Sequence, residues 1–258
     1  MAKPKKIKKK DIEELKEFNT SVEKRDKSCF VPQGGKLKEP IKIRIRDDLT
    51  EKQKGLITLI KDKHTKVVFV DGPAGTAKSF TCVQAGLELL NEKRVSEFLF
   101  LRSIAESSQL KLGALPGLVS DKFGPFMSCL EQKLDELLDA GSIKKLKAEG
   151  FIKAEPINFQ RGASHNAKYI LLEEAQSLSE FEIKTIMTRL GKYSTLVIIG
   201  DHQQADIRNS GFQKIFNLFD DERSRTEGVY CLKFTKDDIL RSGIVKYIVE
   251  RFEEIQGE

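Results

Sequence analysis

The sequence lacks any run of about 18 apolar residues, the length that a membrane-spanning helix requires. No apolar segment follows the lysines near the N-terminus, as it would in a secretory signal peptide. Cysteine is scarce, with four residues and no C-x-x-C spacing, so we predict neither a metal site nor a disulfide framework. We therefore expect a cytoplasmic protein with reduced thiols at Cys29, Cys82, Cys129 and Cys231.

Acidic residues are absent from the first ten positions, and the lysines there account for the whole formal net charge of +6. The rest of the chain carries equal numbers of acidic and basic residues. A lysine-rich end either binds the phosphates of nucleic acid or only keeps the chain soluble. We predict that residues 1–40 form a basic, mobile arm and that residues 41–258 form one folded domain. The lysines are Lys3, Lys5, Lys6, Lys8, Lys9 and Lys10.

One stretch organises the folded domain. An apolar run rich in valine ends at Gly72, and a helical pattern of apolar residues resumes at Lys78. This order predicts a strand, a loop of small residues and a helix. The loop reads G-x-x-x-x-A-K-S, one residue away from the phosphate-binding pattern G-x-x-x-x-G-K-[ST]. The predicted nucleotide-binding residues in this stretch are Gly72, Pro73, Ala74, Gly75, Thr76, Ala77, Lys78, Ser79 and Phe80.

The chemistry of phosphate explains these residue types. Backbone N–H groups wrap a polyphosphate, and a loop of small residues before a helix N-terminus presents such donors. We expect Lys78 to reach the β and γ phosphates and the Ser79 hydroxyl to bind Mg²⁺. Ala77 departs from the pattern, because a Cβ there disfavours left-handed backbone angles by roughly 1–2 kcal/mol. The alternative interpretation is a chance glycine-rich turn before a helix.

Two carboxylates end a second apolar run. Residues 169–172 lead into Glu173 and Glu174, as in a buried parallel strand whose carboxyl end enters a site. A hydrolysing NTPase needs one carboxylate in the metal shell and another to orient and deprotonate water. We predict that Glu173, which replaces the usual aspartate, is the metal ligand and that Glu174 is the base. The alternative is a pair of surface glutamates.

Three further positions are candidates for the same site. A third apolar run ends at Gly200, and Asp201 and Gln204 behind it are expected to sense the γ-phosphate. Gln53 lies near the start of a helix capped by Thr50, where many helicase-like ATPases place a glutamine that reads adenine. Arg241, in the last expected helix from about residue 237 to 252, either stabilises charge on a transferring phosphoryl group or only faces solvent.

Two other segments are less specific. Isoleucines at positions 41, 43 and 45 alternate with basic residues and predict one half-buried strand. Residues 105–155 predict a helical insertion, with an amphipathic helix that stops at Gly141 and a basic stretch behind it. The insertion serves as a lid, as a nucleic-acid surface or as packing at the sheet edge.

Several short motifs occur together and in order: Gly72–Ser79, Leu115–Gly117, Arg161–Gly162, Glu173–Gln176, Thr188–Gly191, Gly200–Asp206, Ser210–Gly211 and Phe234–Arg241. This set resembles the PhoH-like family of bacteria and phages, over about residues 49–252. The resemblance implies an α/β, RecA-like P-loop NTPase fold, with a central, mostly parallel sheet and helices on both faces. It also implies ATP and Mg²⁺ as ligands, a superfamily 1 helicase-like core in RNA or DNA metabolism, and homo-oligomeric rings in which Arg241 completes a neighbouring site.

Three functional hypotheses follow. The first is an ATPase that couples hydrolysis to handling single-stranded nucleic acid, with RNA favoured. The second is a nucleotide-gated binding or assembly module in which Ala77 and Glu173 have removed most turnover. The third is a small-molecule kinase, for which the acidic pair and the Gln204 segment are less suited, because they favour water activation over a phosphate acceptor.

Overall fold

The computed structural model describes residues 35, 37–102, 119–160, 162–204, 210–240, 244, 247 and 251, with only the backbone at 119–127, 158 and 159. Internal contacts divide the chain into residues 1–31 and 32–258, and every described residue belongs to the second unit. The lysine-rich end lies outside the described residues. The second unit is built on a six-stranded sheet in the order β3-β2-β4-β5-β1-β6 with all pairs parallel, which confirms the predicted α/β class.

The elements have the following bounds. The strands are β1 (Val67–Asp71), β2 (Glu97–Arg102), β3 (Ile152–Pro156), β4 (Lys168–Glu173), β5 (Thr195–Gly200) and β6 (Val229–Lys233). The α-helices are α2 (Glu51–Lys61), α3 (Lys78–Asn91), α4 (Val119–Leu137), α5 (Ala140–Ala148), α6 (Glu180–Met187), α7 (Phe212–Phe219) and α8 (Glu222–Thr226). The short 3₁₀ turns are η1 (Ile157–Gln160), η2 (Ala175–Ser177), η3 (His202–Gln204) and η4 (Lys236–Asp238).

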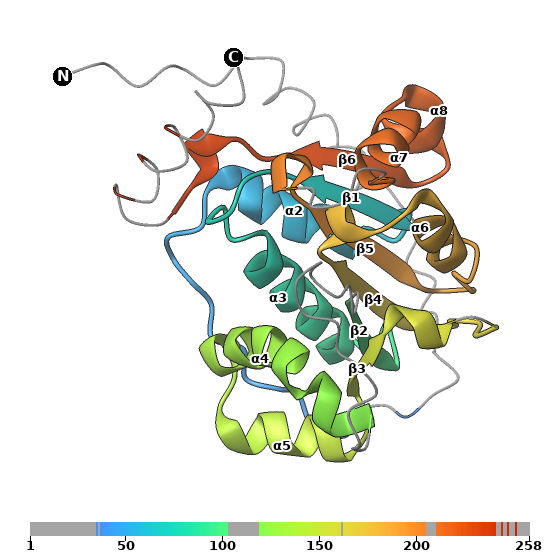
Figure 1. Cartoon of the computed structure of the whole chain (residues 1–258). Helices are drawn as coiled ribbons and strands as arrows, with labels where there is room; N and C mark the ends of the chain where they lie inside the picture. Colours follow the sequence, from blue (N-terminus) through green and yellow to red (C-terminus); the bar gives the residue numbers. More distant parts are fainter. Residues whose placement is uncertain are drawn as a thin grey trace. The chain divides into compact units, whose positions relative to one another are not determined.

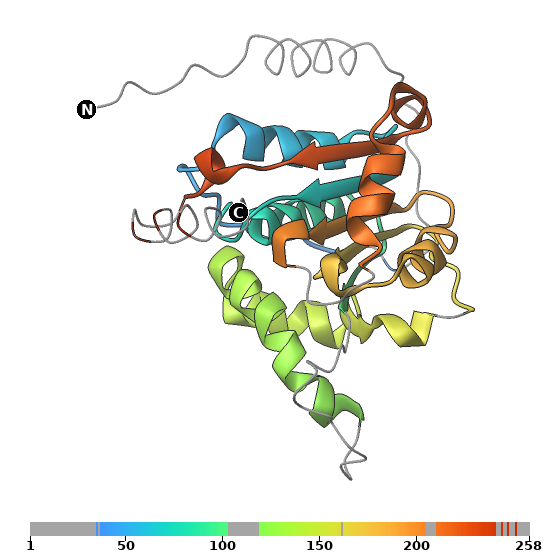
Figure 2. The ribbon, with the colours of Figure 1, turned by 45° about the horizontal axis from the view of Figure 1, so that its top comes forward.

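Both faces of the sheet are buried, which explains why its central strands read as continuous apolar runs. Side chains alternate along each strand between two apolar cores: in β4, Tyr169 and Leu171 face one core and Ile170 and Leu172 face the other. Helices α2, α3, α4 and α5 pack on the first core, and α6 and α7 pack on the second (Figure 1, Figure 2). The first core therefore anchors the helix that follows the glycine-rich loop.

Helix α3 approaches the sheet closely at Gly86. A Cβ at Gly86 would stand 2.5 Å from the ring of Tyr169, so only glycine permits this approach. The Tyr169 hydroxyl donates a hydrogen bond to the Cys82 carbonyl at 2.7 Å, which fixes the helix on β4. Because a short loop joins the end of β1 to α3, the N-terminus of α3 lies at the carboxyl ends of the strands.

The predicted strand at residues 41–45 is not formed. The backbone there is extended, but its polar groups pair with helices: Ile41 N–H donates to Asn91 Oδ1 at 2.7 Å, and Arg44 N–H donates to the Leu137 carbonyl at 2.8 Å. Ile41 and Ile43 pack on the first core, so the alternation correctly indicates an extended segment with one apolar side. Leu37 is also buried in this core, and the folded body therefore begins N-terminal of residue 41.

The insertion differs in detail from its prediction. Helix α4 ends at Leu137, not at Gly141, because Asp139 caps a separate helix by accepting a hydrogen bond from Ser142 N–H at 3.0 Å. Gly141 lies in the first turn of that helix, α5, which also carries the basic stretch. Strand β3, for which no strand was predicted, follows at the sheet edge. The expected helix at 237–252 lies mostly outside the described residues, as do Leu115–Gly117 and Arg161.

Across the described ranges, no helix combines the length and the apolar character needed to cross a bilayer.

Candidate nucleotide-binding site

The predicted phosphate loop joins β1 to α3, which confirms the expected order of strand, loop and helix. Its backbone adopts positive φ angles at Gly72 (148°), Gly75 (87°) and Ala77 (55°). A Cβ at Gly72 would stand 2.7 Å from both the Cβ and the carbonyl oxygen of Phe234, so the loop passes β6 where only glycine fits. Two glycines and one alanine thus supply the turns that wrap the loop around the N-terminus of α3.

Ala77 adopts the left-handed conformation that its Cβ disfavours. It occupies the N-cap position of α3 with φ 55° and ψ 23°, and its side chain provides no cap. An L-residue pays roughly 1–2 kcal/mol for this left-handed conformation.

The substitution Ala77→Gly is expected to raise the free energy of unfolding by about 0.5–1 kcal/mol in urea titrations. It removes the strained Cβ, and the gain exceeds the cost of about 0.4–1 kcal/mol from the added freedom of the unfolded chain. Ala74→Gly is the matched control, because Ala74 lies in the same loop without a positive φ and should only lose stability. Equal destabilisation by both substitutions would show that the backbone at Ala77 is not strained.

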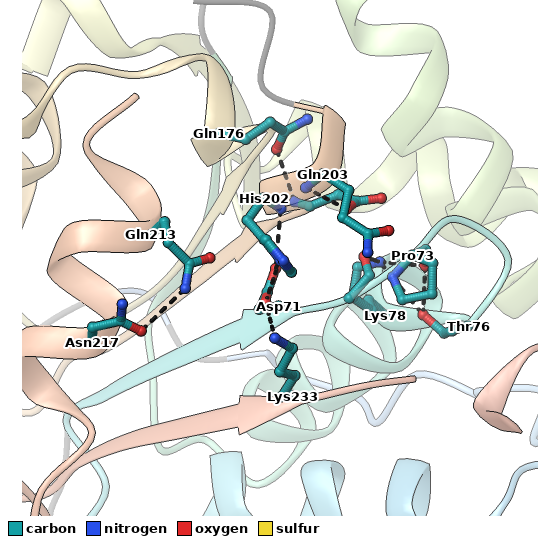
Figure 3. Close-up of polar contacts among 12 residues, drawn as sticks. Asp71, Pro73, Thr76, Lys78, Gln176, His202, Gln203, Gln213, Asn217 and Lys233 are labelled. Atoms are coloured by element: carbon teal, nitrogen blue, oxygen red, sulfur yellow. Dashed lines mark hydrogen bonds and ion pairs between the residues drawn. The ribbon is translucent and has the colours of Figure 1, made fainter. Parts of the chain in front are cut away.

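Lys78 is the first residue of α3 and is buried, with its ammonium group turned back onto the loop. Nζ donates hydrogen bonds to the carbonyls of Gly72 and Pro73, the latter at 2.7 Å (Figure 3). Burial lowers the pKa of Lys78 below its usual 10.5, while the carboxylates of Asp201 and Asp71 act in the opposite direction. The Lys78 ammonium is therefore held by neutral carbonyl oxygens. Charged phosphate oxygens would take their place and accept stronger hydrogen bonds from it.

Glu173, at the end of β4, is buried beside the loop. Burial raises its pKa above the usual 4.5, and a hydrogen bond with Ser79 acts against this shift. A carboxylate and a hydroxyl in contact are hard oxygen ligands of the kind that Mg²⁺ prefers. The two predicted metal ligands thus lie together, and their chemistry fits the ion.

Glu174 follows in a left-handed conformation, with φ 56° and ψ 40°. Its Oε1 lies 3.3 Å from Arg102 Nη2 at the end of β2, and its Oε2 accepts a hydrogen bond from Gln176 Nε2 at 2.6 Å. Both carboxylate oxygens therefore have partners from the protein, which fix the orientation of the predicted base.

Gln176 also connects the ends of β4 and β5. Its Oε1 accepts a hydrogen bond from the backbone N–H of Asp201 at 3.1 Å (Figure 3). Asp201 is buried, which raises its pKa above the usual 3.8, and the charge of Lys78 partly offsets the rise. The carboxylate pair, Lys78 and the predicted sensing segment are thus linked by direct contacts and charge.

These groups surround one cavity of about 410 Å³. Among the predicted site residues, those that line it are Ala74, Gly75, Thr76, Ala77, Lys78, Ser79, Phe80, Glu173, Glu174, Asp201 and Gln204. Gly72 and Pro73 lie outside this lining and hold Lys78 through their carbonyls. Arg241 lies outside the described residues. Lining residues without a predicted role are Arg46, Cys129, Gln132, Lys133, Glu136, Gln176, Ile199, Gly200 and Leu240.

Gln53 does not line the cavity and has no exposed surface. Its Nε2 donates to the carbonyls of Thr76 at 2.9 Å and Asp238 at 3.3 Å, and its Oε1 accepts from Thr50 N–H at 2.8 Å. The amide is thus occupied in tying α2 to the phosphate loop. The contact of Gln53 with adenine stays a prediction, and the described hydrogen bonds show that Gln53 also supports the phosphate loop.

Sequence patterns missed the wall formed by α4 and the residue Arg46. The Arg46 guanidinium lies 5.1 Å from the centroid of the Phe80 ring and is hydrogen-bonded to Asp48. Lys133 and Glu136 of α4 face the same cavity. Nothing local marks Lys133 and Glu136, because polar positions on an amphipathic helix are typical of its solvent-exposed side, and Arg46 lies outside any helix or strand.

The first strand of this parallel sheet leads into a glycine-containing loop, and a buried lysine begins the helix behind that loop. Carboxylates lie at the end of β4. This combination is the architecture of P-loop NTPases. A family profile described as "PhoH-like protein" matches residues 45–253. The chain belongs to the PhoH-like family, and its membership places it among P-loop nucleotide-binding proteins.

Curated relatives agree with this assignment. A PhoH-like protein of Mycobacterium bovis is 32% identical over 194 residues, which cover 73% of this chain and 54% of the relative. A PhoH-like protein of Synechocystis is 31% identical over 81% of this chain and 62% of its own length. Protein PhoH of Escherichia coli is 28% identical over 69% of this chain and 51% of its own length. The chain thus aligns with little more than half the length of these relatives.

Proposed function

We propose that this protein binds and hydrolyses ATP in the cavity bounded by the phosphate loop and the ends of β4 and β5. The observation that carries the proposal is the meeting of Lys78, the Ser79–Glu173 pair and Glu174 around one cavity. Its volume of about 410 Å³ lies within the range of small-molecule sites.

The binding roles follow from charge and position. Lys78 exchanges its carbonyl partners for the β and γ phosphates, and the N–H groups at the start of α3 bind the remaining oxygens. Ser79 and Glu173 would hold Mg²⁺, which supplies neutralisation of the charge that develops on the transferring phosphoryl group.

Glu174 is the proposed general base. Arg102 and Gln176 each occupy one of its oxygens, but a carboxylate offers about four lone-pair sites, so an attacking water still finds an acceptor. Gln204 senses the γ-phosphate from the cavity wall. Arg241 keeps its proposed role as a cation near the phosphoryl group, in its own site or in that of a neighbouring copy in a ring.

The nucleic-acid partner rests on the six lysines among the first ten residues. On the insertion, by contrast, Lys145 lies 3.5 Å from Glu39 and Lys147 lies 2.6 Å from Glu131, so two of the three lysines in its basic stretch already have acidic partners. We infer that single-stranded RNA or DNA is held mainly by the lysine-rich end, through its phosphates.

Steady-state ATP hydrolysis by the full chain, with and without single-stranded RNA or DNA, tests this function. We expect stimulation by the single strand at low salt, its loss at high salt, and the same loss when the six N-terminal lysines are replaced by glutamine. Basal hydrolysis should not change in that variant. Undiminished stimulation would assign the nucleic-acid surface to the folded body.

A nucleotide-gated module with little turnover is the second candidate. It is favoured by the strained Ala77 and by Glu173, whose longer side chain replaces the usual aspartate at the metal. ATP binding without hydrolysis by the wild-type protein would select this candidate.

A further inference from the structure

Asp71 is the last residue of β1 and directly precedes the phosphate loop. Its side chain is only 1% exposed, although a carboxylate at this depth needs donors or cations to replace its lost water. Neither catalysis nor metal binding, as proposed above, uses this group. Its contacts therefore indicate a separate task.

His202 is the main partner of Asp71. The His202 backbone N–H donates to Asp71 Oδ1 at 3.1 Å, and ring nitrogen Nδ1 lies 3.0 Å from Oδ1 and 2.8 Å from Oδ2 (Figure 3). Because an ionised carboxylate only accepts, Nδ1 carries the hydrogen in this contact. Lys233 Nζ is farther away, at 3.9 Å from Oδ2. One buried carboxylate thus holds both the backbone and the ring of His202.

His202 opens the turn that carries the sensing residue. Gln204 N–H donates to the Asp201 carbonyl at 3.0 Å, and Gln203 N–H donates to Asp201 Oδ1 at 3.1 Å, so η3 is internally fixed. Asp201 and Gln204 line the cavity, whereas His202 lies outside its lining. The turn that carries Gln204 is therefore held at two points, by Asp71 through His202 and by Gln176 through the backbone N–H of Asp201.

The contact between Asp71 and His202 is linked by charge to phosphate binding at Lys78. The carboxylates of Asp71 and Asp201 and the His202 ring place ligand atoms within 4.8 Å of one another, and the charge of each carboxylate acts on Lys78 and raises its pKa. When a polyphosphate engages Lys78, Asp71 depends more strongly on its donors from His202. Phosphate binding would thereby tighten the docking of the turn.

We propose that Asp71 is a positioning residue that acts through His202 to place Gln204 against the γ-phosphate. The pair couples the strand before the phosphate loop to the sensing turn after β5. This inference rests on the proposed function and adds the residues by which the site distinguishes a nucleoside triphosphate from a diphosphate.

The test compares the affinities of the full chain for ADP and for a non-hydrolysable ATP analogue, with Mg²⁺, by calorimetry. His202→Ala is expected to reduce the preference for the analogue by roughly tenfold or more with ADP affinity unchanged, and Asp71→Asn should reduce this preference by at least as much. His202→Asn should restore most of the preference, because its amide can donate where Nδ1 does. This variant also remains informative if Asp71→Asn does not fold.

A double-mutant cycle supplies the sharpest criterion. Because both variants lose the contact between the His202 ring and Asp71, Asp71→Asn combined with His202→Ala should cost no more than Asp71→Asn alone. Asn217→Ala, on the exposed surface of α7, is the control that should leave both affinities unchanged. Parallel losses for ADP and the analogue, or additive effects, would reduce Asp71 to a structural role and overturn the inference.

The two levels of the proposal fail differently. A wild-type protein that binds neither nucleotide overturns the proposed function and this inference together. A wild-type protein that prefers the analogue, with variants that keep the same preference, overturns the inference alone.

Discussion

Replacement of Lys78 by alanine is expected to weaken ATP binding by roughly a hundredfold or more and to remove hydrolysis. The variant loses the buried ammonium that faces the cavity, which supplies charge-assisted hydrogen bonds to phosphate. The fold should persist, because burial already disfavours this charge and lowers its pKa. Calorimetric titration with ATP, together with a thermal melt, measures both effects.

Lys66→Ala is the matched control for this experiment. Lys66 is exposed, and it precedes β1 at the opposite end of the strand from the loop, so ATP binding should not change. Lys78→Arg should lose ATP binding nearly as completely as Lys78→Ala, because a planar guanidinium does not fit the space of a compact ammonium. Undiminished ATP binding by Lys78→Ala would show that the nucleotide binds elsewhere.

The substitution Glu174→Gln is expected to reduce the hydrolysis rate by about 10²–10⁴-fold while ATP binding remains. The amide cannot accept a proton from water, but it fills the same volume beside Arg102 and Gln176. Single-turnover measurements should therefore find ATP trapped on the variant. Glu180→Gln, which changes an exposed carboxylate on α6, should hydrolyse ATP at the wild-type rate.

Two outcomes would contradict the assignment of Glu174. Loss of ATP binding together with hydrolysis would mean that Glu174 holds the site together and does not activate water. An unchanged rate would place the base on another residue.

Local patterns were sufficient for the centre of the fold. Apolar runs of strand length, each ending in polar residues, identified β1, β4 and β5, because strands buried on both faces cannot alternate with polar residues. Strand β3 was missed, since it lies at the sheet edge with Lys153 exposed and reads as a mixed segment. The alternation at 41–45 predicted a strand in the sheet. Its backbone pairs instead with Asn91 and Leu137, and these tertiary contacts are not visible in the local sequence.

The candidate site was likewise predicted only in part. The loop and the Glu173–Glu174 pair carry spacing that the sequence reveals, and the structure places them around one cavity. The partner of Asp71 could not be predicted, because His202 lies 131 residues away in the chain. For Gln53, the motif position indicated adenine, whereas its hydrogen bonds to Thr76 and Asp238 emerge only from the folded arrangement.

The most direct measurement is Mg²⁺-dependent release of phosphate from ATP by the purified wild-type chain, beside Lys78→Ala and Glu174→Gln. We expect turnover by the wild type that stops when Mg²⁺ is chelated and is lost in both variants, with ATP still bound by Glu174→Gln. Turnover that survives in Lys78→Ala, or a wild-type chain that does not bind ATP, would contradict the assignment of this cavity as an ATPase site.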